Sequence, residues 1–227
     1  MVGTNEHEFA GLGVPLAWSD AEVAALPERL EDLIADDFPD RPGLAADYRK
    51  AFEVAAPGAS QAEVVGGYLT DRTYRQPSNR LLAARSLATG ATYGYLFRWE
   101  PREARPRVGA VHGGEVSFLF RHQDHPQVTE VLGPKPPEWL ADALSAAWTS
   151  FAATGRPVLP DGPDWPQYRI EDRKTMIIGD RLEVVGDPRG ELRTLLAHDA
   201  PLGLGCLEAA GQDHPGGPDH DLQVDHR

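Results

Sequence analysis

The chain has 227 residues, 41% of them hydrophobic, which is enough for a core in one good-sized domain or two small ones. Its 35 acidic residues outnumber its 22 lysines and arginines, and the net charge of −13 argues against nucleic acid and anionic membranes as partners. The single cysteine, Cys206, excludes an internal disulfide and a cysteine-rich metal site. No apolar run approaches the ~20 residues that cross a bilayer, and a signal peptide is not recognisable, so we expect a cytoplasmic protein.

The first part of the chain carries mainly helix signals. Residues 1–5 are typical of the end of a strand that runs into a loop, and apolar residues at helical spacing then predict helices over 19–34 and 44–56. Ser60 and Glu63 form a capping box that begins a third helix. Pro77 opens a fourth helix, which we expect to reach Gly90.

Strand signals appear in the second part. Residues 93–99 alternate between aromatic and other side chains, which predicts a strand with one aromatic face. Residues 138–154 predict a helix that Gly155 ends, and its apolar stripe consists of Trp139, Leu140, Ala143, Leu144, Ala147, Trp148 and Phe151. Residues 173–178 and 181–185 predict a hairpin. With so few strands, we expect these apolar faces to meet water and the lone chain to be marginally stable.

The end of the chain differs from the rest in composition. Residues 199–227 are rich in Gly, Pro, Asp and His without apolar periodicity, so we expect a folded domain over 1–198 and a polar, disordered tail. The tail contains His214, His220 and His226, but flexible polar tails seldom form closed metal sites. We therefore expect no metal.

The segment GAVHGGE, residues 109–115, is compatible with two roles in ester hydrolysis. Its glycines suit an oxyanion loop of the lipase kind, or the turn that presents a catalytic histidine. An oxyanion loop needs a G-x-S-x-G nucleophile elbow, and no serine of the chain lies in one. If His112 is instead the general base, the order Ser, acid, His places the acid upstream, where Glu8 is the candidate. Both residues are also compatible with ordinary solvated loop positions.

Five segments occur in the order found in a known family: VGTNEHE, YGYLFRWEP, GAVHGGEVSFLF, AAWTSFAATGRPV and DWPQY. Together they resemble the C-terminal portion of type B carboxylesterases, which include bacterial para-nitrobenzyl esterases and cholinesterases. The resemblance extends to about Leu196. It implies the α/β class and the C-terminal part of an α/β-hydrolase fold that lacks the nucleophile elbow and most of the central sheet.

The same resemblance implies site residues. Glu8 matches the triad acid, His112 matches the triad base, and Glu115 matches a glutamate that orients the histidine loop. Glu115 is equally compatible with another role, that of a carboxylate that stabilises the start of a helix. Phe9 departs from the family, which usually has glycine after the acid.

The predicted function is therefore a segment of a serine carboxylester hydrolase that supplies acid and base. It holds neither nucleophile nor oxyanion hole, and we expect it to be inactive alone, with no metal or organic cofactor. Its expected partners are a carboxylic ester, once the enzyme is completed, and a separate N-terminal esterase fragment. We rank a truncated gene first, a split enzyme second and a reused remnant third. The competing function is a non-catalytic interaction module derived from a cholinesterase-like fold.

Overall fold

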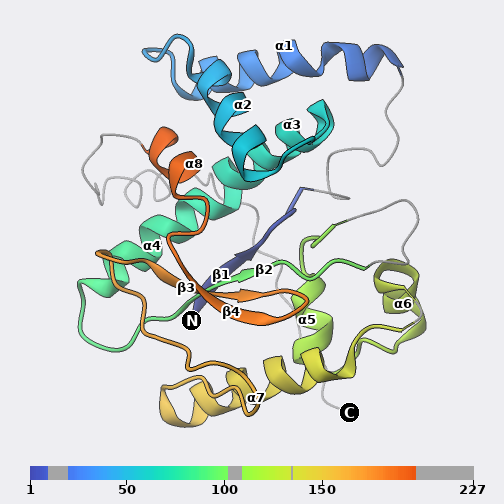
Figure 1. Ribbon diagram of the computed structural model, residues 1–227, viewed down its shortest axis with the longest axis vertical. Helices are drawn as coiled ribbons and strands as arrows, with labels where there is room; N and C mark the ends of the chain where they lie inside the picture. Colours follow the sequence, from blue (N-terminus) through green and yellow to red (C-terminus); the bar gives the residue numbers. More distant parts are fainter. Residues whose placement is uncertain (10–19, 102–108, 134, 198–227) are drawn as a thin grey trace, which may run out of the picture. The chain divides into compact units, whose positions relative to one another are not determined.

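Four strands form one sheet in the computed structural model, which describes residues 1–9, 20–101, 109–133 and 135–197 (Figure 1). The strands lie in the order β1-β2-β3-β4 and comprise β1 (Val2–Asn5), β2 (Gly94–Phe97), β3 (Lys174–Ile178) and β4 (Leu182–Gly186). The first three are parallel, with Val2 paired to Gly94 and Gly94 to Thr175, whereas β4 returns antiparallel to β3 as the predicted hairpin. The carboxyl ends of β1 and β2 therefore meet at one edge of the sheet.

Helices account for most of the remaining described residues. They are α1 (Asp20–Asp37), α2 (Leu44–Ala55), α3 (Gln61–Thr70), the π-helical turn η1 (Asp71–Arg75), α4 (Gln76–Ser86), α5 (Gly114–Leu119), α6 (Pro126–Leu132), α7 (Glu138–Thr154) and α8 (Gly190–Leu195). Helix α7 has the predicted bounds, and Gly155 ends it in the left-handed conformation. The capping box at Ser60 is confirmed: its hydroxyl accepts the Glu63 N–H while the Glu63 carboxylate accepts the Ser60 N–H.

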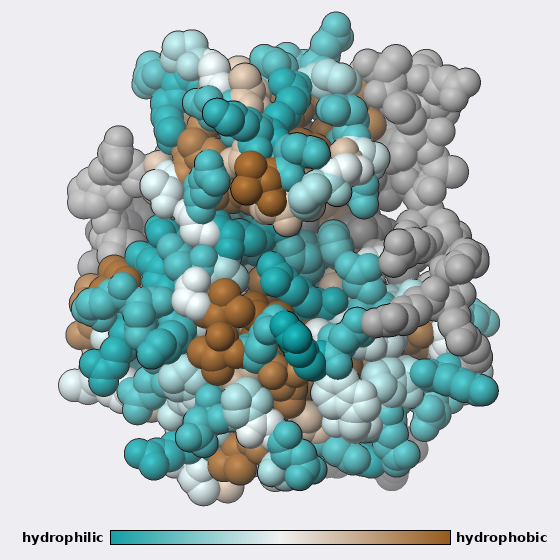
Figure 2. Space-filling model, in the orientation of Figure 1, coloured by the Kyte–Doolittle hydropathy of each residue, from teal (hydrophilic) through white to brown (hydrophobic). Residues whose placement is uncertain are grey.

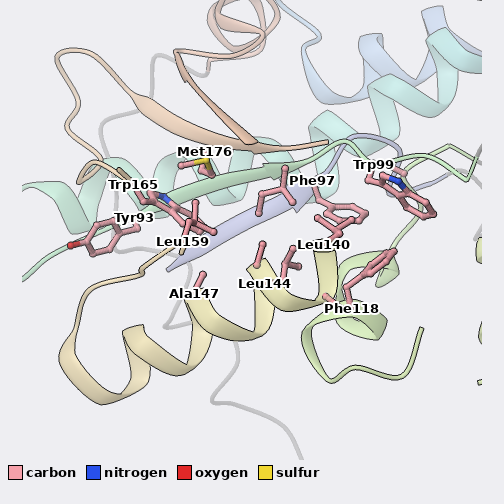
Figure 3. Close-up of a cluster of buried hydrophobic side chains, with 14 of the residues drawn as sticks. Tyr93, Phe97, Trp99, Phe118, Leu140, Leu144, Ala147, Leu159, Trp165 and Met176 are labelled. Atoms are coloured by element: carbon pink, nitrogen blue, oxygen red, sulfur yellow. The ribbon is translucent and has the colours of Figure 1, made fainter. Parts of the chain in front are cut away.

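The apolar stripe of α7 packs against one face of the sheet. Leu140, Leu144 and Ala147 point toward Phe97 of β2 and Met176 of β3, as Figure 3 shows. All five side chains are at most 1% exposed. The expectation that this stripe would meet water is therefore wrong, because the parallel pairing of β1, β2 and β3, which local strand signals do not reveal, supplies a sheet for it to cover. The ends of the stripe are less covered, since Trp148 and Phe151 are partly buried and Trp139 is 43% exposed.

A second apolar cluster joins α1, α2, α3 and α8. Leu30 of α1, Tyr48 of α2 and Tyr68 of α3 are fully buried there, and Leu192 of α8 packs with them. The two tyrosine rings meet edge to face with their centroids 5.4 Å apart. On the face shown in Figure 2, apolar residues gather in a few patches within a largely hydrophilic surface.

Several sequence-based expectations need correction. The third and fourth predicted helices run into one another through η1, and the fourth ends at Ser86 rather than Gly90, which leaves Leu87 70% exposed. Helices α5, α6 and α8 were not predicted, because each has only six or seven residues. The proposed tail, residues 199–227, and Cys206 lie outside the described residues, as does Ser19, the first residue of the helix predicted over 19–34. Within the described residues, no helix is long and apolar enough to cross a membrane.

Candidate active site

Glu8 and His112 lie on the loops that follow β1 and β2, and their side chains meet. His112 Nδ1 lies 2.7 Å from Glu8 Oε2, although 104 residues separate the two in sequence. The parallel pairing of β1 with β2 explains the meeting, because both loops leave the same edge of the sheet. Glu8 is buried, whereas the side chain of His112 is 46% exposed. The structure thus brings together the two residues that sequence analysis singled out.

The buried carboxylate of Glu8 has a partner on each oxygen. Oε1 accepts the backbone N–H of Asn5 at 2.7 Å, and Oε2 contacts the imidazole. A buried carboxylate needs such partners, since an unpaired one is strongly disfavoured away from water. An ionised carboxylate only accepts hydrogen bonds, so Nδ1 of His112 carries the ring proton in this arrangement.

The histidine loop is held by a short turn and by an aromatic neighbour. Gly113 has a φ of 72°, a left-handed conformation that glycine adopts easily, and α5 begins directly after it. The N–H of Gly114 donates to the carbonyl of Val111 at 3.0 Å, which closes the turn around His112. The ring of Tyr74, from η1, lies 5.1 Å from the imidazole and covers part of it.

Asn5 links both loops, and sequence analysis missed it. Its Nδ2 donates to the carbonyl of Val111 and to Glu115 Oε2, both at 2.6 Å, and the residue is 1% exposed. Glu115, in the first turn of α5, also accepts the Tyr95 hydroxyl at 3.4 Å. Burial and the nearby Glu115 and Glu8 carboxylates raise the pKa of Tyr95, so this hydroxyl remains a donor. Glu115 therefore supports the histidine loop indirectly, because it binds Asn5, and Asn5 binds the Val111 carbonyl in that loop.

Charged groups fix the chain directly after β1. The buried Glu6 carboxylate pairs with Arg98, which follows β2, and with Arg189, which precedes α8. Burial alone would raise the pKa of Glu6, but Arg189, Arg75 and Arg98 outweigh it and hold that pKa well below the usual range. Sequence analysis missed this cluster because its members are up to 183 residues apart.

The turn η1 delivers the remaining arginine. Arg75 donates to the backbone carbonyls of Asn5 and Glu6, each at 3.1 Å, and pairs with Asp71 one turn earlier. Asp71 in turn accepts the Tyr48 hydroxyl at 2.8 Å. A π-helical turn often occurs at functional positions, and here it directs Arg75 to the segment between Asn5 and Glu8.

The arrangement suits general acid–base chemistry. With Nδ1 directed at Glu8, Nε2 is the nitrogen of His112 left for a substrate or a nucleophile, and no described residue hydrogen-bonds to it. Among the described residues, no group of three His, Cys, Asp or Glu side chains could hold a metal ion. The Phe9 position, where the family usually has glycine, is occupied by a ring 5.8 Å from that of Tyr74, and the contact between Glu8 and His112 is retained beside it.

Comparisons with known proteins find relatives in both sequence and fold. The sequence model of the carboxylesterase family matches residues 1–192. The chain is 28% identical over 134 residues to the para-nitrobenzyl esterase of Bacillus subtilis (strain 168), which takes in 56% of this chain and 26% of the esterase. Among solved structures, a thermophilic pNB esterase is similar with a TM-score of 0.62 and 26% identity, over 86% of this chain and 37% of the other.

A carboxylesterase of Geobacillus stearothermophilus is similar with a TM-score of 0.67 and 26% identity, over 86% of this chain and 39% of the other. The chain therefore spans well under half the length of these relatives. Its sheet and flanking helices are part of an α/β-hydrolase fold, as the family resemblance implied. Because the family match covers residues 1–192, from the first residue into the start of α8, this chain belongs to the carboxylesterase family.

Proposed function

We propose that this chain supplies the acid and the base of a serine carboxylic ester hydrolase. The observation that carries the proposal is the 2.7 Å contact between Glu8 Oε2 and His112 Nδ1, with Nε2 left for a hydroxyl. The attacking serine comes from outside these 227 residues, because no serine of the chain lies in a G-x-S-x-G elbow. The ester is a carboxylic ester, the substrate class of the family.

In the completed site, His112 Nε2 takes the proton of the serine hydroxyl as its oxygen bonds to the ester carbonyl carbon. The tetrahedral intermediate then expels the alkoxide, which receives that proton from the imidazolium and leaves as an alcohol. Water attacks the acyl-enzyme in the same way, and the acid and the serine are released. Glu8 keeps the proton on Nδ1 before the reaction and stabilises the imidazolium during it.

The position of β1 supports a partner that carries the serine. Within the described residues, β1 pairs with β2 on one side only, so it is an edge strand. An edge strand presents backbone groups that a further strand can pair with. The acid follows this strand directly, so a strand added parallel to β1 would bring its own carboxyl end next to Glu8 and His112. We therefore propose as partner a polypeptide segment that carries the serine on such a strand.

Labelling with a fluorophosphonate tests the proposal. We compare the chain alone with the chain mixed with an N-terminal esterase segment that carries the serine. The first segment to test is any that is encoded directly upstream. We expect labelling and hydrolysis of p-nitrophenyl butyrate only in the mixture, because the chain alone has no nucleophile. His112→Gln should lower hydrolysis by the mixture by about 10³-fold or more, as loss of a triad member does elsewhere.

Two results would contradict the proposal. One is labelling of a serine of this chain in the absence of a partner. The other is a mixture in which His112→Gln hydrolyses the ester as fast as the unaltered chain. His122→Asn is a matched control. His122 is an exposed histidine on the loop after α5, so its substitution should leave the rate unchanged.

A further inference from the structure

We propose that His7 is a positioning residue for His112: its neutral imidazole holds the segment before His112, and its protonation releases that segment. The inference rests on the proposed function in one respect, since it gives that acid–base pair a dependence on pH. His7 stands between Glu6 and Glu8 in the loop after β1, and nothing in the chemistry above uses it. It is therefore a titratable group within the site that has no role in the proposed reaction.

His7 binds both backbone polar groups of Ala110. Its own N–H donates to the Ala110 carbonyl at 3.0 Å, and its Nδ1 accepts the Ala110 N–H at 3.1 Å. A parallel bridge between His7 and Val111 continues this pairing to the residue before His112. Ala110 is 1% exposed, so water cannot easily replace a lost partner of its N–H.

The neighbouring glycine fits the imidazole closely. Gly109 has a φ of 69°, and a Cβ atom placed on it would lie 2.6 Å from His7 Nδ1. The backbone at residues 109 and 110 therefore lies directly against the ring. Asn5 holds Val111 and the turn closes at Gly114, whereas the ring of His7 holds residues 109 and 110, which those two contacts do not reach.

The hydrogen bond from Ala110 requires a neutral His7. An imidazolium carries a proton on both ring nitrogens, so Nδ1 would become a donor that faces another donor. Glu100 Oε1 lies 3.7 Å from the same Nδ1 and offers the protonated ring an alternative partner. The geometry thus defines two arrangements, one with Ala110 bound to a neutral ring and one with Glu100 bound to a cationic ring.

The charges around His7 set the balance between these arrangements. Burial lowers the pKa of His7 most, Arg189 and Arg75 lower it further, and the Glu6 and Glu100 carboxylates oppose them; the net effect is a pKa below its ordinary value. The ring is therefore neutral at pH 7.5, and the arrangement with Ala110 prevails. Acidification below the ordinary value of 6.5 shifts the balance toward Glu100.

Hydrogen exchange at the Ala110 amide, measured by NMR on the full chain, tests this inference. In the unaltered chain we expect protection at pH 7.5 that falls by about 10-fold or more at acid pH, after correction for the intrinsic pH dependence of exchange. His7→Asn places a non-titrating side-chain oxygen near the position of Nδ1 and should keep protection at both pH values. His7→Phe keeps a ring without an acceptor and should lose protection at both.

His122→Asn is the matched control and should behave like the unaltered chain, because His122 is exposed. Persistent protection of Ala110 in His7→Phe, or the same loss on acidification in His7→Asn as in the unaltered chain, would overturn the inference. If His7→Phe does not fold, the His7→Asn comparison still decides. This readout needs no esterase activity, so a chain that fails the labelling test above can still pass or fail this one.

Discussion

Replacing Asn5 by aspartate should destabilise the chain strongly at neutral pH, because the change replaces the one nitrogen that donates two hydrogen bonds and alters almost no volume. The Asn5 amide donates to Glu115 Oε2 and to the Val111 carbonyl, both at 2.6 Å. Loss of the bond to the carboxylate costs about 1.5–3 kcal/mol, and loss of the bond to the carbonyl costs about 0.5–1.5 kcal/mol. The bond to the Val111 carbonyl costs less to lose, because that carbonyl still accepts the Gly114 N–H.

Repulsion adds to this loss. The new carboxylate would lie among those of Glu8 and Glu115, in a region where Asn5 is 1% exposed. Like charges about 4 Å apart near a protein surface repel by up to about 4 kcal/mol. We therefore expect Asn5→Asp to lower the free energy of unfolding by about 3–6 kcal/mol at pH 7.5, which is a large share of a typical domain's total.

Urea unfolding at pH 7.5 and at pH 5 measures this effect. The deficit should shrink at the lower pH, because the crowded carboxyl group takes up a proton more readily in the folded state and then donates a hydrogen bond again. Asn79→Asp, the same change at a half-buried position of α4, is the control and should stay within about 0.5 kcal/mol. An Asn5→Asp chain as stable as the unaltered one at pH 7.5 would refute the assigned role of Asn5.

Three further substitutions test other parts of the structure by the same unfolding measurement. Gly109→Ala should cost at least about 2 kcal/mol, because a Cβ atom meets the His7 ring, whereas Gly113→Ala, with an equally positive φ and open space, should cost about 1 kcal/mol; equal costs would contradict the packing of His7. Leu144→Ala should cost about 2–5 kcal/mol and Leu87→Ala less than about 0.5 kcal/mol, and the reverse order would contradict the core. Glu6→Gln should cost about 3 kcal/mol at pH 7 because it leaves the buried Arg189 without its carboxylate partner. Since the folded-state pKa of Glu6 is lowered, its contribution to the free energy of unfolding is complete above pH 4.5 and is lost as the pH falls through the folded-state pKa. The difference in stability between the unaltered chain and Glu6→Gln should therefore disappear in acid. A difference that stays constant down to pH 2 would count against the ion pairs.

Local sequence patterns predicted the long elements of this fold well. The stripe from Leu140 to Ala147 and the stop at Gly155 defined α7, and the capping box at Ser60 defined the start of α3. Such signals lie within a few residues of one another, so no tertiary contact is needed to read them. Residues 1–5 were predicted as the end of a strand, and β1 lies there, but its pairing with β2 is a contact across about 90 residues that no local pattern reveals.

For the site, too, the sequence pointed to some residues and not to others. Glu8 and His112 were found because their segments resemble a family, and the structure brings them within hydrogen-bonding distance. Asn5 lies three residues before Glu8, yet its partners are Val111 and Glu115, which no local spacing connects to it. The partners of Glu6 and His7 are equally distant in sequence. Residues that support a site from a neighbouring strand become visible only once the strand pairing is known.

The state of the His112 ring is the most direct measurement of whether Glu8 and His112 form a working acid–base pair. Nitrogen chemical shifts of the His112 imidazole, assigned with the His112→Gln chain, distinguish the two neutral tautomers. We expect the proton on Nδ1 at pH 7.5, with a hydrogen-bonded N–H signal that is lost in Glu8→Gln, because the 2.7 Å contact to Glu8 Oε2 requires a donor. A ring protonated mainly on Nε2, or one that Glu8→Gln leaves unchanged, would show that the two residues do not act together.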